Sequence, residues 1–367
     1  MTTPYIEQEI QEQPAVLSRV LRAVRPAIED FIEPGMQQRL HLVGCGDMFF
    51  AADVVSWFAR LHLHLDVRSW RGMDFRWMAS ELGPEDLVVC ASVSGRTPRV
   101  IEAARAARRA GARVLGITDN EGSPFSKEVD RAVLLQTSPP SALSAGPYPG
   151  YHHPVGQTKT YTAVLLAELV AAARAAGDDA LDLEAVPARV AASLPGLSRL
   201  VAAGAPEWLA GRENVLVLGS GPHLGTALYG AAKFLEYAVR AQAQCLEEVN
   251  HLEIFVADEL TLAVILAPDG PSLSRAEELP EPWENLGVRS LVVGPAASHP
   301  AGRADRLPLE PEAPHVAPFV QAAALQLIAY RGAVALGRDP NAWLGGVRTD
   351  LLIETSRRTV RGSRILS

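Results

Sequence analysis

DLVVCASVSGRTPRVIEAARAARRAG (residues 86–111) passes from a continuous apolar run, through a turn rich in hydroxyl groups, into a segment with charges at helical spacing. The apolar run is typical of a strand buried on both faces, as strands in parallel sheets are. Glu102, Arg105 and Arg109 share one face of the expected helix, and Gly111 is suited to end it. The stretch therefore predicts a strand, a tight turn and a helix, the repeating unit of parallel α/β sheets.

The same alternation continues on both sides of this stretch. A helical segment of about 30 residues comes first, with a kink or boundary expected near Pro14. Further strands are predicted at LHLVGCG (40–46), LDVRSW (65–70), RVLGITD (113–119) and RAVLLQTS (131–138). Strands that alternate with helices predict a parallel sheet with helices on both faces.

The pattern then starts again in the second half of the chain. ENVLVLGSG (213–221), TLAVILAP (261–268) and RSLVVGPA (289–296) repeat the order and type of the first elements, although not their residues. We therefore predict an α/β protein with two tandem domains, each a parallel sheet flanked by helices in a flavodoxin-like, three-layer arrangement. The expected divisions are a helical segment 1–34, a first domain 35–178, a second domain 205–345 and a tail 346–367.

Composition excludes several classes of protein. With 367 residues, 48% hydrophobic and 21% charged, the chain can bury one large core or two ordinary ones. A formal net charge of -8 disfavours nucleic acids and anionic membranes as partners. The sequence has no apolar run of about 18 residues and no signal-like amino terminus, so we expect a cytoplasmic protein that does not span a membrane.

Cysteines and histidines do not form a recognisable metal site. Cys45, Cys90 and Cys245 are odd in number and lack CxxC spacing, which argues against a disulfide framework and against zinc. His152 and His153 are adjacent, so their side chains point apart, and no third ligand is evident. We expect reduced thiols, no metal and no cofactor, and we assign the two histidines to substrate contact.

The hydroxyl-rich turn has two interpretations. Ser92, Ser94 and Thr97 surround Gly95 where a strand hands over to a helix, and backbone N–H groups at such a point favour an anion. Alternatively, one of the hydroxyls is an ordinary helix cap. The turn matches neither the GxGxxG nor the P-loop pattern. In the second half, APDGPSLSR stands in the corresponding place without the hydroxyl cluster, so only one half would carry such a turn.

These residues, together with others, resemble a known family. The turn is similar to the S-x-S-G-x-T phosphate-binding segment of the sugar isomerase (SIS) domain family. In chain order, further segments resemble the isomerase part of glutamine-fructose-6-phosphate amidotransferase and its standalone relatives: EIQEQP (9–14), VGCGDMFFA (43–51), PVGQTKTYT (154–162), YGAAKFLEYA (229–238) and LEEVNH (246–251). The resemblance implies two tandem SIS domains and raises the expectation that the turn binds phosphate.

The resemblance also implies a set of substrate-binding and phosphate-binding residues. Asp47 and Met48 depart from the family's pattern, which has small hydroxyl residues there. The implied residues are Cys45, Gly46, Asp47, Ser92, Val93, Ser94, Gly95, Thr97, Val155 and Lys159.

Two catalytic groups are implied in the same way. Glu236 matches the family's base, and His251 matches the histidine associated with opening the sugar ring. A carboxylate whose pKa is raised by partial burial can move a proton between C1 and C2, and an imidazole can exchange protons with the ring oxygen and the anomeric hydroxyl. Glu248 is the expected orienting partner of His251, with Glu247 as the open alternative.

The main departure lies near the carboxyl end. Arg348 falls where amidotransferases carry a lysine thought to reach the sugar carbonyl. Arginine stays protonated and forms no Schiff base, but it can polarise a carbonyl or bind phosphate, so it stays in the expected catalytic set. Lys159 and Lys233 are the other lysines expected near the site.

The sequence therefore predicts a standalone phosphosugar isomerase that moves a proton between aldose and ketose forms of a sugar 6-phosphate. Release of an amine from an aminosugar phosphate is a further expectation. We expect no glutaminase half and therefore no use of glutamine as an ammonia source. The competing prediction is a non-catalytic sugar-phosphate sensor. The resemblance also implies a homodimer with a shared active site, in which His251 serves the neighbouring chain.

Overall fold

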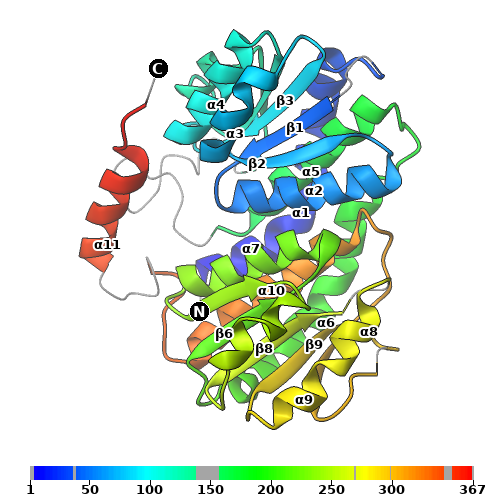
Figure 1. The fold of residues 1–367 in the computed structure, drawn as a ribbon, viewed down its shortest axis with the longest axis vertical. Coiled ribbons are helices and arrows are strands. Elements are labelled where there is room, and N and C mark those ends of the chain that lie inside the picture. Colours follow the sequence, from blue (N-terminus) through cyan, green and yellow to red (C-terminus); the bar gives the residue numbers. More distant parts are fainter. Residues whose placement is uncertain are drawn as a thin grey trace. The chain divides into compact units, whose positions relative to one another are not determined.

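Two parallel sheets with the same strand order form the fold (Figure 1). The computed structural model describes residues 4–35, 39–137, 157–267, 270–297, 299–342 and 349–365. Its chain divides into two compact units that interleave along the sequence. The first unit comprises residues 13–152, 159–187 and 350–367, and the second comprises residues 1–12, 153–158 and 188–349. The domain divisions expected in chain order remain a prediction.

The first unit holds a five-stranded parallel sheet in the order β2-β1-β3-β4-β5. Its strands are β1 (Arg39–Gly44), β2 (Val67–Arg71), β3 (Asp86–Ala91), β4 (Arg113–Thr118) and β5 (Arg131–Leu134). Helices α2 and α5 pack against each other and the sheet, and α3 and α4 form a second contacting pair. These helices are α2 (Asp47–His62), α3 (Gly72–Met78), α4 (Pro98–Arg109) and α5 (Lys159–Ala176). With helices on both faces, β3 is buried along its whole length.

The second unit repeats this design in the order β7-β6-β8-β9-β10. Its strands are β6 (Asn214–Leu218), β7 (Arg240–Gln244), β8 (Thr261–Leu266), β9 (Arg289–Pro295) and β10 (Ala304–Leu309). Helix α7 packs on β6, β7 and α10, and α9 packs on β9. The helices are α7 (Leu224–Glu236), α8 (Leu273–Glu278), α9 (Pro280–Glu284) and α10 (Ala317–Ala335). The predicted fold class, two α/β domains with parallel sheets, is confirmed.

Within the described ranges, three α-helices lie outside these repeats. They are α1 (Tyr5–Phe31), α6 (Ala185–Trp208) and α11 (Thr349–Ser356). The boundary expected near Pro14 is absent, because α1 continues through that residue. Proline removes one backbone hydrogen bond, but Ile10 and Leu17 on either side are fully buried, and such packing supplies most of a helix's stability.

Helix α6 was not anticipated from the sequence. Pro195 and Pro206 lie inside the helix and obscure its periodicity. Burial of Val190 and Val201 instead holds the helix in place.

Among the residues that the structure describes, no helix is both long enough and apolar enough to cross a bilayer.

Candidate functional site

The first unit brings two predicted segments to one edge of its sheet. Strands β1 and β3 are parallel neighbours, with Val43 opposite Cys90, so the turns that follow them leave the same edge. The strand order reverses at this point, because β2 lies on one side of β1 and β3 on the other. Ligands of open parallel sheets bind outside the carboxyl ends of strands at such a reversal.

The hydroxyl groups of the second turn are not used to cap the following helix. Thr97 stands at the N-cap position of α4, yet its side chain makes no capping hydrogen bond. Its Oγ1 instead accepts a hydrogen bond from Ser92 Oγ at 3.2 Å. Pro98, the first residue of the helix, has no N–H. The Val100 N–H donates to the Thr97 carbonyl oxygen at 3.1 Å, so the Arg99 N–H and the hydroxyls are the first-turn groups suited to an anion at the positive end of the helix dipole.

Gly95 gives this turn its tight shape. Its N–H donates to the Ser92 carbonyl oxygen at 2.8 Å, and its own carbonyl oxygen accepts the N–H of Phe125 at 3.1 Å. The residue has a φ of +63°, and a Cβ placed there would lie 2.1 Å from Ser123 Oγ. A glycine is required at this position for both reasons.

The neighbouring turn, after β1, has a different chemical character. Gly46 has a φ of +58° and makes no side-chain cap for α2. Burial raises the pKa of the Cys45 thiol, and a backbone hydrogen bond from Gly72 offsets only part of that effect. Asp47 opens α2 with a carboxylate. A carboxylate accepts hydrogen bonds from hydroxyls and repels phosphate, so Asp47 is suited to a sugar hydroxyl.

The second unit contains an ion pair on α7. Glu236 is the last residue of the helix, and its side chain is 28% exposed. Lys233, three residues earlier, is fully buried and places Nζ 2.7 Å from Glu236 Oε2. The ammonium also donates to the carbonyl oxygen of Gln157 at 3.2 Å and lies 5.0 Å from the centre of the Tyr229 ring. The sequence indicated Lys233 only as a remaining lysine, although its spacing from Glu236 is that of neighbours on a helix.

His251 has a different carboxylate partner from the one first expected. Its exposed ring places Nε2 3.4 Å from Glu247 Oε1, and Glu247 also pairs with Arg275 at 2.9 Å. Glu248 accepts the backbone N–H of His251 with its carbonyl oxygen at 2.9 Å. The carboxylate that faces the imidazole is thus Glu247, the alternative that the sequence left open.

Glu236 and His251 lie at opposite ends of the second sheet. Helix α7 leaves from the carboxyl end of β6 and returns to the amino end of β7, so Glu236 lies near the amino ends of the strands. His251 follows the carboxyl end of β7 and is linked through Glu247 to Arg275 of α8. The five residues of β7 alone extend about 16 Å. One chain does not bring these two side chains together.

Several predicted residues lie outside the described part of the chain, namely Val155, Arg348, His152 and His153. Lys159 is described and is buried as the first residue of α5. Across the described ranges, no cluster of three or more His, Cys, Asp or Glu side chains is arranged to hold a metal ion.

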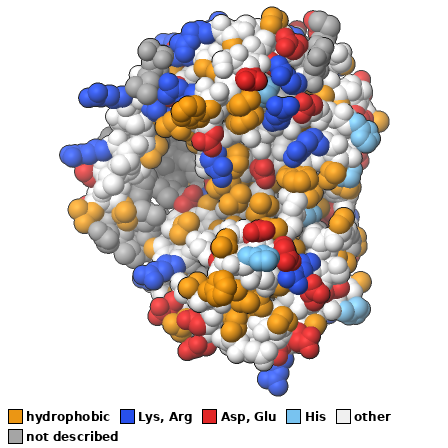
Figure 2. Space-filling model, viewed as in Figure 1, with side chains coloured by type: hydrophobic (Ala, Val, Ile, Leu, Met, Phe, Trp, Pro, Cys, Tyr) orange, Lys and Arg blue, Asp and Glu red, His pale blue; other side chains and the backbone are white. Residues whose placement is uncertain are grey.

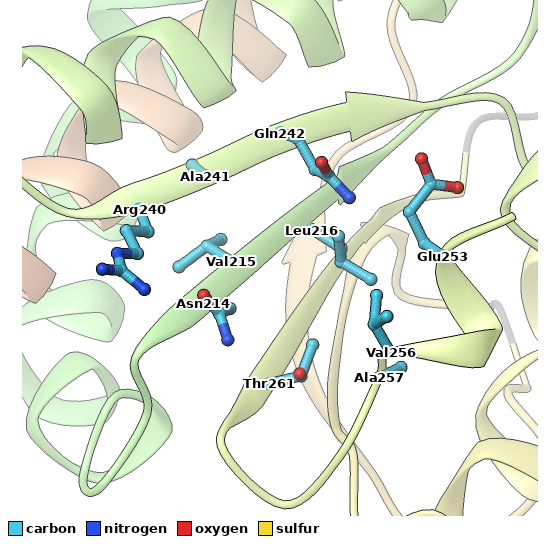
Figure 3. A pocket seen from close by; sticks show the side chains of 10 residues that line it. All are labelled: Asn214, Val215, Leu216, Arg240, Ala241, Gln242, Glu253, Val256, Ala257 and Thr261. Carbon is cyan, nitrogen blue, oxygen red and sulfur yellow. The ribbon is translucent and has the colours of Figure 1, made fainter.

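A groove of about 400 Å³ lies on the second sheet, away from the carboxyl ends of its strands (Figure 3). Asn214, Arg240 and Thr261, the first residues of β6, β7 and β8, contribute to its lining. None of the predicted site residues lines it. The chemistry of the molecule therefore points to the turns and the ion pair, and not to this groove.

The comparisons with known proteins agree with this geometry. Residues 36–171, which contain both turns of the first sheet, match the SIS domain family. Residues 36–171 are therefore a SIS domain. It is 31% identical to a glutamine–fructose-6-phosphate aminotransferase (isomerizing) from Thermus thermophilus and 29% identical to one from Caulobacter vibrioides. In both cases the match covers 91% of this chain but only 56% of the relative, so this SIS protein spans about half the length of these relatives.

Solved structures share the fold of this SIS protein. The C-terminal domain of glucosamine-fructose-6-phosphate aminotransferase from Francisella tularensis has a TM-score of 0.77 at 19% identity, covering 92% of this chain and 97% of that one. Tagatose-6-phosphate ketose/aldose isomerase from Escherichia coli has a TM-score of 0.76 at 21% identity, covering 95% and 98%. Glucosamine-6-phosphate deaminase from Thermotoga maritima has a TM-score of 0.69 at 19% identity, covering 92% and 96%. These similarities establish a fold that several phosphosugar proteins share.

Proposed function

We propose that this SIS protein is a phosphosugar isomerase that moves a proton between C1 and C2 of a sugar 6-phosphate. The observation that carries the proposal is the buried ammonium of Lys233 held 2.7 Å from the partly exposed carboxylate of Glu236. Burying a charged amine costs free energy unless it is paired, and a helix that needed only to pack would use an apolar side chain there. Such pairs are concentrated at functional sites.

The phosphate of the substrate is assigned to the Ser92–Thr97 turn. The hydroxyls of Ser92, Ser94 and Thr97, at the amino terminus of α4, support this role. Asp47, at the adjacent edge, would bind a sugar hydroxyl. The SIS family match over residues 36–171 supports the same assignment.

Proton transfer is assigned to Glu236. Its carboxylate takes the proton from C2 of the open-chain sugar while O1 gains a proton, which gives an enediol. The carboxyl then returns its proton to C1 while O2 loses a proton, so that no atoms are gained or lost overall. With an amino group at C2, the same transfer gives an imine that water hydrolyses to a ketone and ammonia. Lys233 favours the ionised form of Glu236, which is the form that accepts a proton. His251 would exchange protons with the ring oxygen and anomeric hydroxyl to open the ring.

A homodimer follows from this division of roles. Glu236 and His251 of one chain lie at opposite ends of the second sheet, so a reaction that uses both needs a second chain. The side chains after His251 support such an arrangement, since Leu252, Phe255 and Val256 are 57%, 82% and 74% exposed. Apolar side chains gathered on a surface are typical of an interface. On the face in Figure 2, acidic and basic side chains are interspersed, which suits a small-molecule enzyme better than a nucleic-acid-binding protein.

A panel of sugar 6-phosphates and 2-amino sugar 6-phosphates, incubated in deuterated water, tests the proposal. We expect deuterium at C2 or C1 of at least one substrate, together with isomerised product or ammonia. Glu236→Gln is expected to bind that substrate but to catalyse no exchange. Binding without exchange or turnover by the wild-type protein would instead support the sensor, since a sensor needs the phosphate turn but no base.

A further inference from the structure

A buried carboxylate anchors the chain segment that contacts Lys233. Glu9 of α1 is only 1% exposed. Its Oε2 accepts the backbone N–H of Thr158 at 2.9 Å and the Thr158 hydroxyl at 3.3 Å. Its Oε1 accepts the hydroxyl of Tyr5 at 2.6 Å. Three donors thus compensate a buried carboxylate, and through them Glu9 fixes a backbone position 149 residues away in sequence.

The anchored segment is also the partner of the buried lysine. Gln157, adjacent to Thr158, supplies the carbonyl oxygen that accepts a hydrogen bond from Lys233 Nζ at 3.2 Å. Gln326 approaches from α10, donating to the Tyr229 hydroxyl at 2.8 Å and lying 3.5 Å from the Thr158 carbonyl oxygen. Gln326 therefore links the Tyr229 ring, which lies beside the ammonium, to Thr158. The neighbouring residue, Gln157, supplies the carbonyl oxygen that accepts a hydrogen bond from the ammonium.

The pKa of buried Tyr237 agrees with the closeness of Glu9, Lys233 and Glu236. Burial raises the pKa of Tyr237 well above its usual value, Lys233 lowers it, and Glu236 and Glu9 raise it further. Both carboxylates and the ammonium therefore act on one buried phenol. Glu9, Lys233 and Glu236 belong to a single cluster inside the second unit.

A lysine needs such support to hold a fixed position. Its ammonium ends a flexible four-carbon stem and makes no directional fork with a carboxylate, unlike a guanidinium. The Gln157 carbonyl precedes α5 and belongs to no helix or strand, so its own position depends on its neighbours. Glu9 supplies a charge-assisted hydrogen bond at the next residue, and such bonds are the stronger ones in proteins.

We propose that Glu9 is a positioning residue for the Lys233–Glu236 pair, acting through the Gln157–Thr158 backbone that it anchors. Its importance for catalysis rests on the proposed isomerase function, but its effect on Lys233 does not. Removal of the Glu9 carboxylate releases the segment, and the ammonium loses the carbonyl that holds it beside Glu236.

Lysine acylation, read peptide by peptide with mass spectrometry, measures this effect without any substrate. The chain has only three lysines, so exposed Lys127 serves as the internal standard and buried Lys159 reports unfolding. In Glu9→Ala we expect Lys233 to react about tenfold faster, the change that loss of a hydrogen bond to a charged group allows. Glu9→Asp, which is too short to reach Thr158, is expected to act in the same direction.

Two variants separate position from charge. Glu9→Gln keeps an amide oxygen for the Thr158 N–H, so we expect Lys233 to react within about twofold of wild type. Glu29→Gln makes the same change at an exposed site of the same helix and serves as the control. Unchanged Lys233 reactivity in both Glu9→Ala and Glu9→Asp would overturn the proposal, and so would equal acceleration in Glu9→Ala and Glu9→Gln. If Lys159 also becomes reactive in Glu9→Ala, that variant has partly unfolded, and the reactivity of Lys233 in Glu9→Asp then decides whether the proposal stands.

Catalysis provides the second measurement. We expect Glu9→Ala to lower kcat for the C1–C2 proton exchange about tenfold with little change in KM, and Glu9→Gln to restore most of it. A loss of kcat that Glu9→Gln does not restore would contradict the positioning role. If the wild-type protein lacks all exchange activity, the isomerase assignment fails, while the Lys233 labelling still decides the role of Glu9.

Discussion

Thr97 shows that the type and position of a residue do not by themselves determine which hydrogen bond its side chain makes. A threonine before a helix is ordinarily a cap, and the sequence allowed that interpretation. In the structure its hydroxyl receives a hydrogen bond from Ser92 and leaves the helix terminus uncapped. The geometry therefore weakens the capping interpretation and leaves donors available to a ligand.

Removing the hydroxyls tests their role directly. In the triple variant Ser92→Ala, Ser94→Ala, Thr97→Ala we expect sugar-phosphate binding to weaken by several kcal/mol, since hydrogen bonds to charged groups contribute about 1.5–3 kcal/mol each. Titration calorimetry with glucose 6-phosphate measures the change. Ser193→Ala, which removes a hydroxyl on α6, is the control and should bind as wild type. Unaltered affinity in the folded triple variant would remove the phosphate assignment.

Gly95 and Gly122 form a matched pair for a second test. Both have a positive φ, +63° and +70°, but a Cβ at Gly95 would collide with Ser123, whereas nothing lies within 4 Å of one at Gly122. Gly122→Ala should cost about 1–2 kcal/mol of unfolding free energy, the price of the left-handed conformation alone. Gly95→Ala should cost clearly more and should also weaken phosphate binding. Equal losses in urea denaturation would show that the turn yields to the added methyl group.

Helix α5 carries an ionisable side chain inside the protein core. Nearly all its residues are buried, as expected for a helix that packs on β1, β3 and α2. Glu168 lies among them, fully buried, and neither carboxyl oxygen has a hydrogen-bond partner among the residues that the structure describes. Burial raises the pKa of Glu168 well above its usual value, so the folded protein holds a proton on this carboxyl to a higher pH than the unfolded chain does.

Glu168 should make the stability of the protein fall with rising pH. The unfolded chain releases the proton above about pH 4.5 while the folded chain retains it, so unfolding releases one proton. Between about pH 4.5 and the higher pKa of Glu168 in the folded protein, this lowers the free energy of unfolding by about 1.4 kcal/mol per pH unit. Glu168→Gln cannot ionise, so its stability relative to wild type should rise by that slope in urea denaturation.

Glu121→Gln, at an exposed site, is the control for this experiment and should follow the wild-type curve at every pH. Parallel pH dependences of wild type and Glu168→Gln would mean that Glu168 ionises in the folded protein.

The whole molecule repeats one strand order, yet its halves differ in chemistry. The first sheet has hydroxyls at the point where its strand order reverses, and the second carries the Lys233–Glu236 pair on α7 and His251 beyond β7. Because Glu236 and His251 lie at opposite ends of the second sheet, a shared active site would recruit them from different chains.

Refolding a mixture of inactive variants tests this sharing. Glu236→Gln and His251→Asn chains, unfolded together in equal amounts and refolded, form half mixed dimers, each with one intact site. We expect about 25% of wild-type activity, given a symmetric interface and independent sites. Each variant refolded alone is the control and should stay inactive. A mixture no more active than its parents would show that both residues act within one chain.

The sequence by itself determined the fold class and the strand, turn and helix of residues 86–111. Strand and helix signals are local. A strand buried on both faces requires a continuous apolar run, and a tight turn requires a glycine, as in residues 86–95. The same locality explains the helix boundary that the sequence allowed at Pro14 and the missed α6, where packing against distant residues outweighs a proline's local cost.

Only the tertiary structure decided which side chains meet. Glu247 faces His251, Glu9 binds Thr158 from 149 residues away, and Lys233 turns inward to a backbone carbonyl. It also separated Glu236 from His251, although their positions are only 15 residues apart in the chain. Sequence spacing gives only the number of residues between two positions. The distance between them in space depends on the directions of the helix and strand that carry them, and α7 and β7 end at opposite ends of the sheet.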